Sequence, residues 1–299
     1  MSQPDVATGR ETRADPPAGT ALACVDWQAF SGPGARWGRS IARMEAEGES
    51  RITQAVAEVT RGETFSDVAP GWLRFLQRNM PVAAFAFNQC GHILRDISGR
   101  SPWGGMSDGL ALQASMQYRQ AQSLVLYAAD MEQRLGAMPM QAARNRWRTD
   151  RHWLPAHHFL EQAATCRDWG EALVAVNLCF EPLIGQLLRR EFAMNSGPTH
   201  GDHVTPLVAA TGQEEWALTR AWTIAAVTFL LADPSHSAAN RELLEGWIAR
   251  QLPVAEAATR DLGGLEEQLP TRMVPRGRAV ECVIDDQRAL LADIGLAAA

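Results

Sequence analysis

The chain has 299 residues, of which 46% are hydrophobic and 21% are charged, a composition typical of a globular protein. Its net charge of −6 and its lack of any basic run or basic–aromatic patch argue against a nucleic-acid partner. The N-terminus has no apolar signal-peptide core, and no uninterrupted apolar run is long enough to span a membrane. The five cysteines form no C-x-x-C motif. We therefore expect a reduced, cytoplasmic protein with no membrane part.

The first twenty residues differ in composition from the rest of the chain. Residues 1–20 are rich in Pro, Gly, Thr and charged side chains, a composition that buries too little apolar surface to fix one conformation. We therefore predict a disordered or extended N-terminal arm over 1–20. From about Leu22 onward, the apolar residues recur with the helical period.

Helical patterns follow one another toward the middle of the chain. The helices predicted before residue 98 span 44–61, 70–79 and 82–97. A turn-rich segment, SGRSPWGGMSDG at 98–109, interrupts the pattern. The next helix, 110–135, is the longest uninterrupted one, and its apolar residues suit burial on more than one side.

The second half of the chain continues in the same way. The helices predicted there span 140–148, 152–165, 168–192, 214–231, 238–250, 253–260 and 275–296. Asp168 stands where an N-cap is needed. No strand pattern of period two and no internal repeat occurs, and no linker separates two cores. We therefore predict an all-α fold, a bundle of long helices with additional flanking helices, in a single domain over 21–299.

One carboxylate lies inside an almost entirely apolar helix. Glu181 occurs in NLCFEPLIGQLLRREF, directly before Pro182. A buried acid is costly unless a partner satisfies it, so this residue could be a metal ligand, a catalytic acid or a structural residue paired with an Arg or a backbone group. Pro182 removes one helical hydrogen bond, and we expect it to bend or loosen the helix there.

The metal motif typical of such bundles is missing. Di-iron carboxylate bundles need a Glu from each of two helices and Glu-x-x-His from two others, because residues at i and i+3 share a helix face. The residues three positions before the seven histidines are Gln89, Thr149, Leu154, Pro155, Gly197, His200 and Asp233. Since none of them is Glu, the sequence argues against a di-iron site in this chain.

Three weaker metal-binding patterns each have a structural explanation. HGDH at 200–203 lies in a loop flanked by Gly and Pro, where a solvated or interface loop is the simpler interpretation. DPSH at 233–236 fits the start of a helix. His157 and His158 are neighbours, which places them on different helix faces and argues against a shared metal.

Signals for other chemistry are also missing. The chain has no G-x-S-x-G elbow and no P-loop, and no predicted strand precedes the glycine-rich segment at 98–109. Asp130 and Glu132 face different sides of a helix and cannot act on one atom. The residues alone therefore indicate a helical protein without an active site.

Four segments resemble the β (small) subunit of the hydroxylase component of soluble di-iron monooxygenases, the bacterial multicomponent family that oxidises small hydrocarbons, phenol and toluene. The matching stretches are YRQAQSLVLYAADMEQRLG at 118–136, DWGEALVAVNLCFEPLIGQLLRREF at 168–192, HGDHVTPLV at 200–208 and EEWALTRAWTIAAVTFLLADPSHSAANRELLEGWIARQLPVAEAA at 214–258. Their order and spacing fit, and within the family they look closest to the propane, alkene and cyclic-ether oxidising group. The resemblance departs at the N-terminus, where many relatives have a longer arm that wraps a neighbouring subunit.

The resemblance implies a fold, partners and a division of labour. The fold would be ferritin-like, as in ribonucleotide reductase, within an (αβ)2 or (αβγ)2 hydroxylase. The α subunit would hold the di-iron centre, whereas this chain would be a non-catalytic scaffold with no cofactor of its own. A reductase with FAD and an iron–sulfur centre would pass NADH electrons to the irons, and a small coupling protein would gate the reaction. One oxygen atom of O2 would enter a hydrocarbon such as propane or an alkene.

Large and cationic side chains on half-polar helix faces are candidates for contacts with the α subunit or with the second αβ protomer. Together with the buried acid, the candidates are Arg119, Trp147, Trp153, Trp169, Glu181, Arg189 and Arg190. Ordinary core packing or a solvated Arg is the alternative explanation for each.

Two other functions stay open from the sequence. One is a stand-alone helical metalloprotein with unconventional ligands, drawn from Glu132, Glu181, His200, His203 and His236. The other is a helical adaptor unrelated to oxidation. Metal content of the isolated chain separates the first from a scaffold, and a neighbouring reading frame with two Glu-x-x-His motifs would argue against the second.

Overall fold

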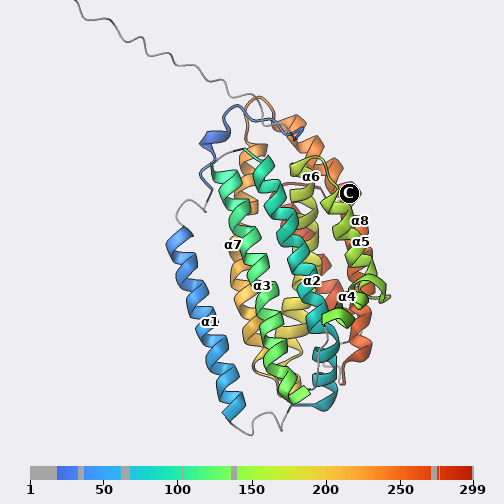
Figure 1. Ribbon diagram of the computed structural model, residues 1–299. Helices are drawn as coiled ribbons and strands as arrows, with labels where there is room; N and C mark the ends of the chain where they lie inside the picture. Colours follow the sequence, from blue (N-terminus) through green and yellow to red (C-terminus); the bar gives the residue numbers. More distant parts are fainter. Residues whose placement is uncertain are drawn as a thin grey trace, which may run out of the picture.

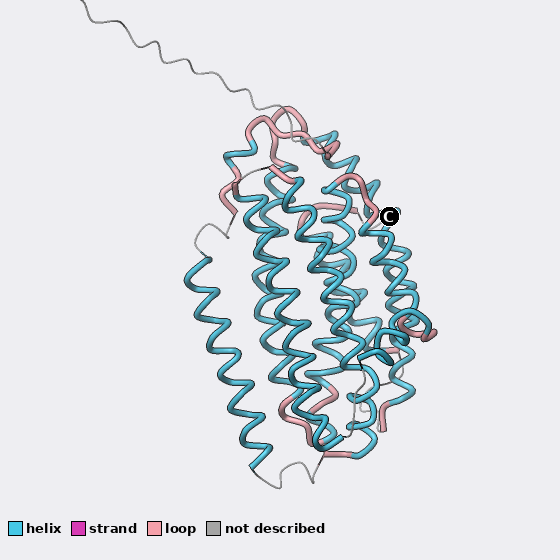
Figure 2. Tube along the Cα trace, in the orientation of Figure 1, coloured by secondary structure: helices cyan, strands magenta, loops and turns pink. Residues whose placement is uncertain are grey.

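The computed structural model describes seven stretches of the chain. They are residues 19–32, 37–61, 68–102, 104–135, 140–270, 275 and 277–297. Within these stretches the chain consists of helices and short connections, with no strand (Figure 2). Apart from its last two residues, the predicted arm over 1–20 lies outside them.

Long helices run side by side and form a bundle (Figure 1). Those labelled α are α1 (Trp37–Arg61), α2 (Pro70–Arg100), α3 (Gly105–Leu135), α4 (Met140–Thr149), α5 (Leu154–Ala164), α6 (Trp169–Leu173), α7 (Thr205–Leu231), α8 (Ser237–Gly263) and α9 (Arg278–Asp293). Two π-helical segments, η4 (Val174–Gly185) and η5 (Leu187–Asn195), continue α6, and the short 3-10 turns are η1 (Trp27–Ala29), η6 (Pro198–His200) and η7 (Gly264–Gln268). The all-α prediction is confirmed for the described residues.

Two predicted helix boundaries at prolines are wrong. α2 continues through Pro81 for 31 residues, and α8 continues through Pro253 for 27 residues. An interior proline costs a helix about 3 kcal/mol. Met80 and Val82, on either side of Pro81, are buried, and each such side chain contributes about 1.5–3 kcal/mol. Tertiary packing therefore outweighs the local preference to stop.

The helix from Trp169 to Asn195 is the buried centre of the bundle. All twelve residues of η4 are buried, and α8 and α9 pack against them while α7 packs against η5. The predicted N-cap is confirmed, because Asp168 Oδ1 accepts a hydrogen bond of 2.8 Å from the Gly170 N–H. By length and composition the stretch Trp169–His200 could cross a membrane, but 89% of its most apolar window is buried, as in the core helix of a soluble protein.

The predicted helix over 168–192 is confirmed in position but not in type. Both η4 and η5 have π-helical bonding, in which each N–H bonds a carbonyl five residues back. Pro182 lies inside η4 and has no N–H to donate. The helix around this proline is therefore loosened, as predicted, by π-helical turns that hold more residues than α-helical ones. These turns determine which side chains of the helix face the bundle centre.

Two outer segments are attached to this bundle. α1 lies at one side, next to α7 (Figure 1), where Arg51 makes two hydrogen bonds of 2.9 and 3.1 Å to Glu214. The segment before η1 crosses one end of the bundle. There the Val25 N–H donates to Asp233 Oδ2 at 2.7 Å, and the Ala23 N–H donates to Asn240 Oδ1 at 3.0 Å.

Candidate functional site

Glu181 is paired with an arginine of its own helix. Arg189, two turns further on, donates from Nη2 to Glu181 Oε2, and the two side chains are only 2% and 1% exposed. The Arg189 guanidinium also lies 5.2 Å from the centre of the Phe87 ring, a cation–π contact. Of the two partners that the sequence left open, an Arg or a backbone group, the structure shows the Arg, and it lies in the same chain.

Helix α3 supplies the remaining hydrogen bonds of this buried ion pair. Gln117 donates to Glu181 Oε1 at 2.9 Å, and Gln120 Oε1 accepts from Arg189 Nη1 at 2.9 Å. Gly185 leaves room for the pair, because a Cβ there would lie 2.7 Å from Arg189 Nη2 and 3.0 Å from Glu181 Oε2. One amide thus binds the carboxylate, the other binds the guanidinium, and the glycine leaves space for both charged groups.

A second polar contact lies one turn toward the start of the same helix. Asn177 donates to Gln113 Oε1 at 2.8 Å and to Thr223 Oγ1 at 2.9 Å, and all three side chains are buried. Gln113, Gln117 and Gln120 share one face of α3, spaced by four and three residues. This spacing is a sequence signal for polar residues on a buried helix face, and the apolar periodicity of α3 alone does not reveal it.

This arrangement leaves no vacant ligand for a metal ion. The guanidinium binds one oxygen of Glu181, and the Gln117 amide binds the other. A cation placed here would lie beside the fixed positive charge of Arg189. Among the described residues, no other His, Cys, Asp or Glu pair joins Glu181 to offer ligand atoms within 4.8 Å. Both oxygens of the Glu181 carboxylate are therefore occupied by groups of this chain.

An apolar cavity of about 70 Å³ opens beside Arg189. Its wall includes Trp72, Phe75, Phe87 and Phe192. No carboxylate, imidazole or thiol is among the side chains that line it. The polar side chains in its lining are those of Asn79, Gln120, Arg189 and Thr205.

HGDH at 200–203 is a structural corner. Asp202 is buried, and its Oδ1 accepts hydrogen bonds from the Val204 and Thr205 N–H groups at 2.9 and 3.0 Å, while its Oδ2 accepts from Trp72 Nε1 at 2.7 Å. The His200 ring packs on Trp72 with 5.1 Å between ring centres. His203 is exposed, so the two histidines of this motif have different surroundings.

DPSH at 233–236 starts α8, as predicted. Asp233 Oδ1 accepts from the Ser235 and His236 N–H groups at 3.0 and 2.9 Å and lies 2.9 Å from the His236 ring. Burial opposes the charged form, but two backbone N–H bonds and the imidazole hold the pKa of this carboxyl below its ordinary value. The motif shapes the chain and tethers Val25.

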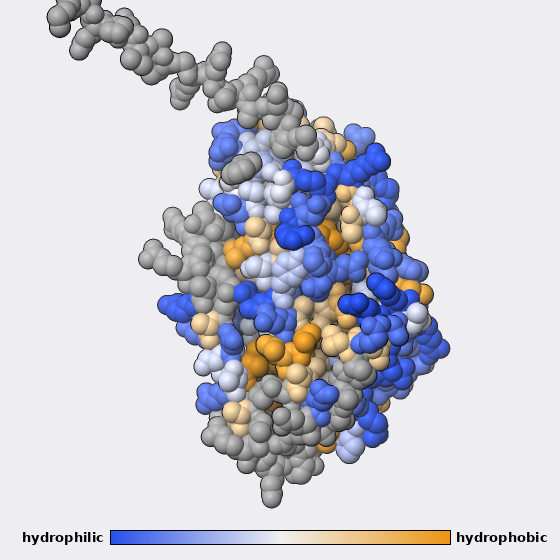
Figure 3. Space-filling view, viewed as in Figure 1, coloured by the Kyte–Doolittle hydropathy of each residue, from blue (hydrophilic) through white to orange (hydrophobic). Residues whose placement is uncertain are grey.

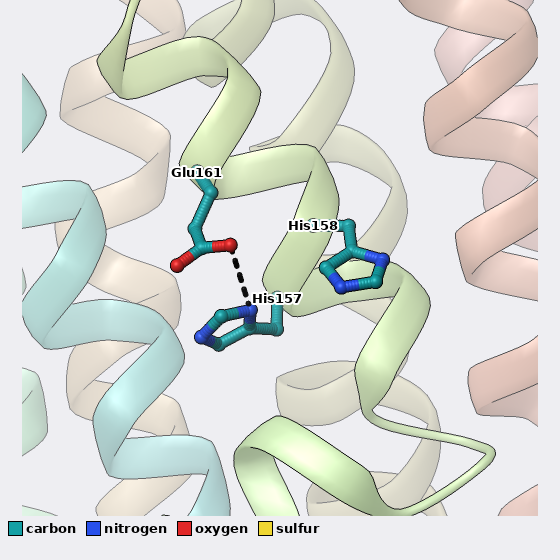
Figure 4. Close-up of side chains that lie close together, drawn as sticks. All are labelled: His157, His158 and Glu161. Atoms are coloured by element: carbon teal, nitrogen blue, oxygen red, sulfur yellow. Dashed lines mark ion pairs between the residues drawn. The ribbon is translucent and has the colours of Figure 1, made fainter.

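Three ligand-type side chains meet on α5 and form what we call the α5 cluster: His157, His158 and Glu161 (Figure 4). His157 is 8% exposed and packs edge-on against Trp147, whereas the other two are exposed. The two histidine side chains differ in burial. The prediction that their positions on different helix faces keep them from a common site is wrong, because one ligand atom from each of the three side chains lies within 4.8 Å of the others. The missed signal is His158-x-x-Glu161, the i, i+3 spacing in reverse order.

The remaining ligands considered for a stand-alone metalloprotein are dispersed. Glu132 is exposed on α3, and His236 contacts Asp233 at the start of α8. Together with the pairing of Glu181 and the packing of His200, these positions assemble no site from the proposed set.

The predicted interface residues fall into two groups. Trp147, Trp153 and Trp169 are at most 4% exposed, so this chain's own core already encloses them, as it encloses the buried ion pair. Arg119 and Arg190 are partly exposed, with 26% and 30% of their side chains accessible. The enclosed tryptophans differ from what we predicted because helical spacing alone does not tell a core face from a subunit face.

The two arginines are held by acids of other helices. Arg119 on α3 lies 2.9 Å from Glu215 on α7, and Arg190 on η5 lies 2.5 Å from Asp286 on α9. Both ion pairs join neighbouring helices at the rim of the bundle. They position two cationic stems where a second chain could contact them.

The chain matches a family model described as Methane/Phenol/Alkene Hydroxylase over residues 4–234. It is 27% identical over 278 residues to the propane 2-monooxygenase hydroxylase component small subunit of Rhodococcus jostii (strain RHA1), covering 93% of this chain and 76% of that one. It is 28% identical over 235 residues to the protein of the same name from Mycolicibacterium smegmatis, covering 78% and 64%. Over 104 residues it is 32% identical to the methane monooxygenase component A beta chain of Methylococcus capsulatus (Bath), covering 34% and 27%.

Two solved structures share the fold. Toluene-bound toluene 4-monooxygenase superposes with a TM-score of 0.77 at 20% identity, over 83% of this chain and 81% of that one. Xenon-pressurised phenol hydroxylase from Pseudomonas sp. OX1 gives a TM-score of 0.75 at 18% identity, over 99% and 88%. The fold is therefore the ferritin-like helical bundle that was predicted.

Proposed function

Since the chain belongs to the methane/phenol/alkene hydroxylase family, we propose that it is the small, or β, subunit of a di-iron monooxygenase hydroxylase and acts as a scaffold. The printed names of its relatives support the subunit assignment. The buried ion pair supports the scaffold role, because an arginine of the same chain neutralises the one acid inside η4.

Other buried acids support the same proposal. Both oxygens of Asp202 and of Asp233 accept hydrogen bonds, and Glu215 pairs with Arg119. A buried carboxylate kept for catalysis or metal binding would need a free coordination site. These carboxylates serve instead to hold helix starts, loops and neighbouring helices in place.

The reaction would belong to the assembled complex. In this proposal an α subunit holds the di-iron centre, which supplies the activation of O2, and NADH supplies electrons through a reductase with FAD and an iron–sulfur centre. A coupling protein, a second αβ protomer and a γ subunit are further candidate partners. The relatives named for propane favour a small hydrocarbon such as propane or an alkene as the substrate.

The surface of the chain supports a protein partner. Large hydrophobic side chains are exposed on two long helices, including Leu126 on α3 at 54% and Leu207 on α7 at 38%. An apolar patch lies over the lower part of α3 in the view of Figure 3. The partly exposed Arg119 and Arg190 remain our candidates for polar contacts at the rim of such an interface, where arginine is favoured.

Co-purification tests this proposal directly. We expect the untagged chain to elute in one complex with a tagged subunit that carries two Glu-x-x-His motifs, and we expect that complex to consume NADH and O2 in the presence of a small hydrocarbon once reductase and coupling protein are added. Oxygen-dependent turnover by this chain alone, or its failure to join the complex, would refute the scaffold role.

A further inference from the structure

In the α5 cluster, one ligand atom from each of two imidazoles and one carboxylate lies within 4.8 Å of the others. Figure 4 shows His157 and Glu161 paired on one side of α5 and the His158 ring on its other side in this view. We propose that these three side chains, His157, His158 and Glu161, form a binding site for a divalent transition-metal cation of the Zn²⁺ type. This site is separate from the buried ion pair, and it does not depend on the function proposed above.

The separation of two of the ligand atoms already fits a metal. His157 Nδ1 lies 3.3 Å from Glu161 Oε2. Tetrahedral Zn²⁺ with bonds of about 2.0–2.2 Å to nitrogen and oxygen holds its ligand atoms about 3.4 Å apart. The spacing of four residues on α5 places both side chains on one helix face. These two groups therefore need almost no rearrangement to share a cation.

His157 Nδ1 makes no hydrogen bond of good geometry, and its contact with the Glu161 carboxylate is an ion pair only when the imidazole is protonated. Its side chain is only 10% exposed, and an unsatisfied buried polar atom costs about 1–3 kcal/mol. Burial lowers the pKa of His157, which favours the neutral imidazole that binds metals. A lone pair facing a carboxylate oxygen at this distance is repulsive unless a proton or a cation lies between them, and a metal ion would satisfy both.

Packing fixes one ligand and leaves the other two adjustable. The Trp147 ring lies 5.2 Å from the His157 ring, edge to face, and holds it in place. His158 and Glu161 are exposed and spaced by three residues, so rotation of their side chains can bring the third ligand atom closer than 4.8 Å. A water molecule would complete the fourth position, as in other sites with three protein ligands.

The surrounding charge limits the affinity. Arg148 is near enough to lower the pKa of His157 and would repel a cation. Glu161 contributes the single negative charge of the site. We therefore expect one cation per chain with moderate affinity.

The test uses the untagged full chain after dialysis against a chelator has removed bound metal. Binding of Zn²⁺ is measured by calorimetric titration with ZnCl2, and binding of Co²⁺ is measured by absorption during titration with CoCl2. We expect one equivalent to bind and the Co²⁺ complex to show the visible bands of tetrahedral coordination. His158→Ala and Glu161→Gln should each weaken binding at least about tenfold, the lower end of what the loss of an outer-shell partner costs. His203→Ala, which removes an exposed histidine from another loop, should change nothing.

The exposed positions keep the test independent of folding. Because His158 and Glu161 are exposed, their substitutions should leave the circular dichroism spectrum unchanged, whereas His157→Asn could disturb the packing on Trp147. Absence of saturable Zn²⁺ binding, or equal binding by the wild type and both exposed variants, would overturn the proposal. Neither result would affect assembly with an α subunit, so the two proposals fail separately.

Discussion

Two groups of ligand-type side chains in this bundle differ in what lies between them. At the centre, the carboxylate of Glu181 accepts hydrogen bonds from the Arg189 guanidinium and from Gln117, and Gln120 in turn accepts from Arg189. On α5, the carboxylate of Glu161 faces an imidazole nitrogen that makes no hydrogen bond of good geometry. The comparison shows that a carboxylate in a helical bundle is not a site by itself, because the group that neutralises it decides its chemistry.

The largest expected effect on stability comes from removing the arginine of the buried ion pair. Arg189→Met should lower the free energy of unfolding by about 3–5 kcal/mol, because it leaves Glu181 charged and buried without a counter-ion. The double variant Glu181→Leu/Arg189→Met should recover most of that loss, since it removes both desolvation costs. Urea denaturation of the purified chain measures both.

A matched surface pair gives the control for this experiment. Arg190 pairs with Asp286, but both side chains are partly exposed. Arg190→Met should therefore cost less than about 1 kcal/mol. If Arg189→Met cost no more than this control, the central pair would not hold the bundle together as we describe.

The next largest effect concerns Asp233, an acid held by backbone N–H groups, in comparison with Glu181, which is held by an arginine. Asp233→Ala should cost about 1–3 kcal/mol, because it frees the N–H groups of Val25, Ser235 and His236. The folded-state pKa of Asp233 is lowered, so its stabilisation is present above the unfolded pKa of about 3.9 and is lost as pH falls below it. The loss of stability on acidification should be shallower in the variant, as followed by thermal unfolding at pH 3 to 6.

A smaller effect tests how tightly the centre is packed. Gly185→Ala should destabilise the chain by about 1–2 kcal/mol, since its methyl group would lie 2.7 Å from Arg189 Nη2. Gly99→Ala in α2, where a Cβ meets nothing within 4 Å, should instead stabilise it by about 0.5–1 kcal/mol. Melting temperatures of the two variants should move in opposite directions, and a shared direction would contradict the close packing.

The smallest effect concerns the neutral histidine against Trp72. Burial lowers the pKa of His200, so its neutral form is favoured in the folded state. The stabilisation is complete above the unfolded pKa of about 6.5 and declines as pH falls toward the folded pKa. His200→Phe should make the loss of stability between pH 7.5 and 5.5 smaller than in the wild type, as followed by thermal unfolding. An unchanged pH dependence would show that His200 titrates normally.

The same contrast explains what the sequence could predict. Local rules found the helices, the Asp168 cap and the role of DPSH at 233–236, because each depends on residues close in sequence. The need for a partner beside Glu181, either an Arg or a backbone group, followed from the cost of a buried charge. The helix boundary predicted at Pro81 was wrong because long-range packing outweighs one lost helical hydrogen bond.

The misses have a common physical cause. Gln117 and Gln120 are polar, and only their contact with the buried ion pair shows why they face the core. Trp153 and Trp169 fit a subunit face or a core face equally well until the neighbouring helices are in place. The convergence of His158 with its neighbours depends on side-chain rotation, which helical spacing does not specify.

The iron content of the assembled hydroxylase tests the central claim most directly. If this chain is a scaffold whose Glu181 is closed by Arg189, the purified complex carrying Glu181→Gln should hold the same iron per αβ pair as the wild type. The double variant Glu181→Leu/Arg189→Met should do so as well, and it avoids leaving an unpaired buried charge. Loss of iron in both complexes, with the subunits still associated, would contradict the account and return Glu181 to the role of a metal ligand.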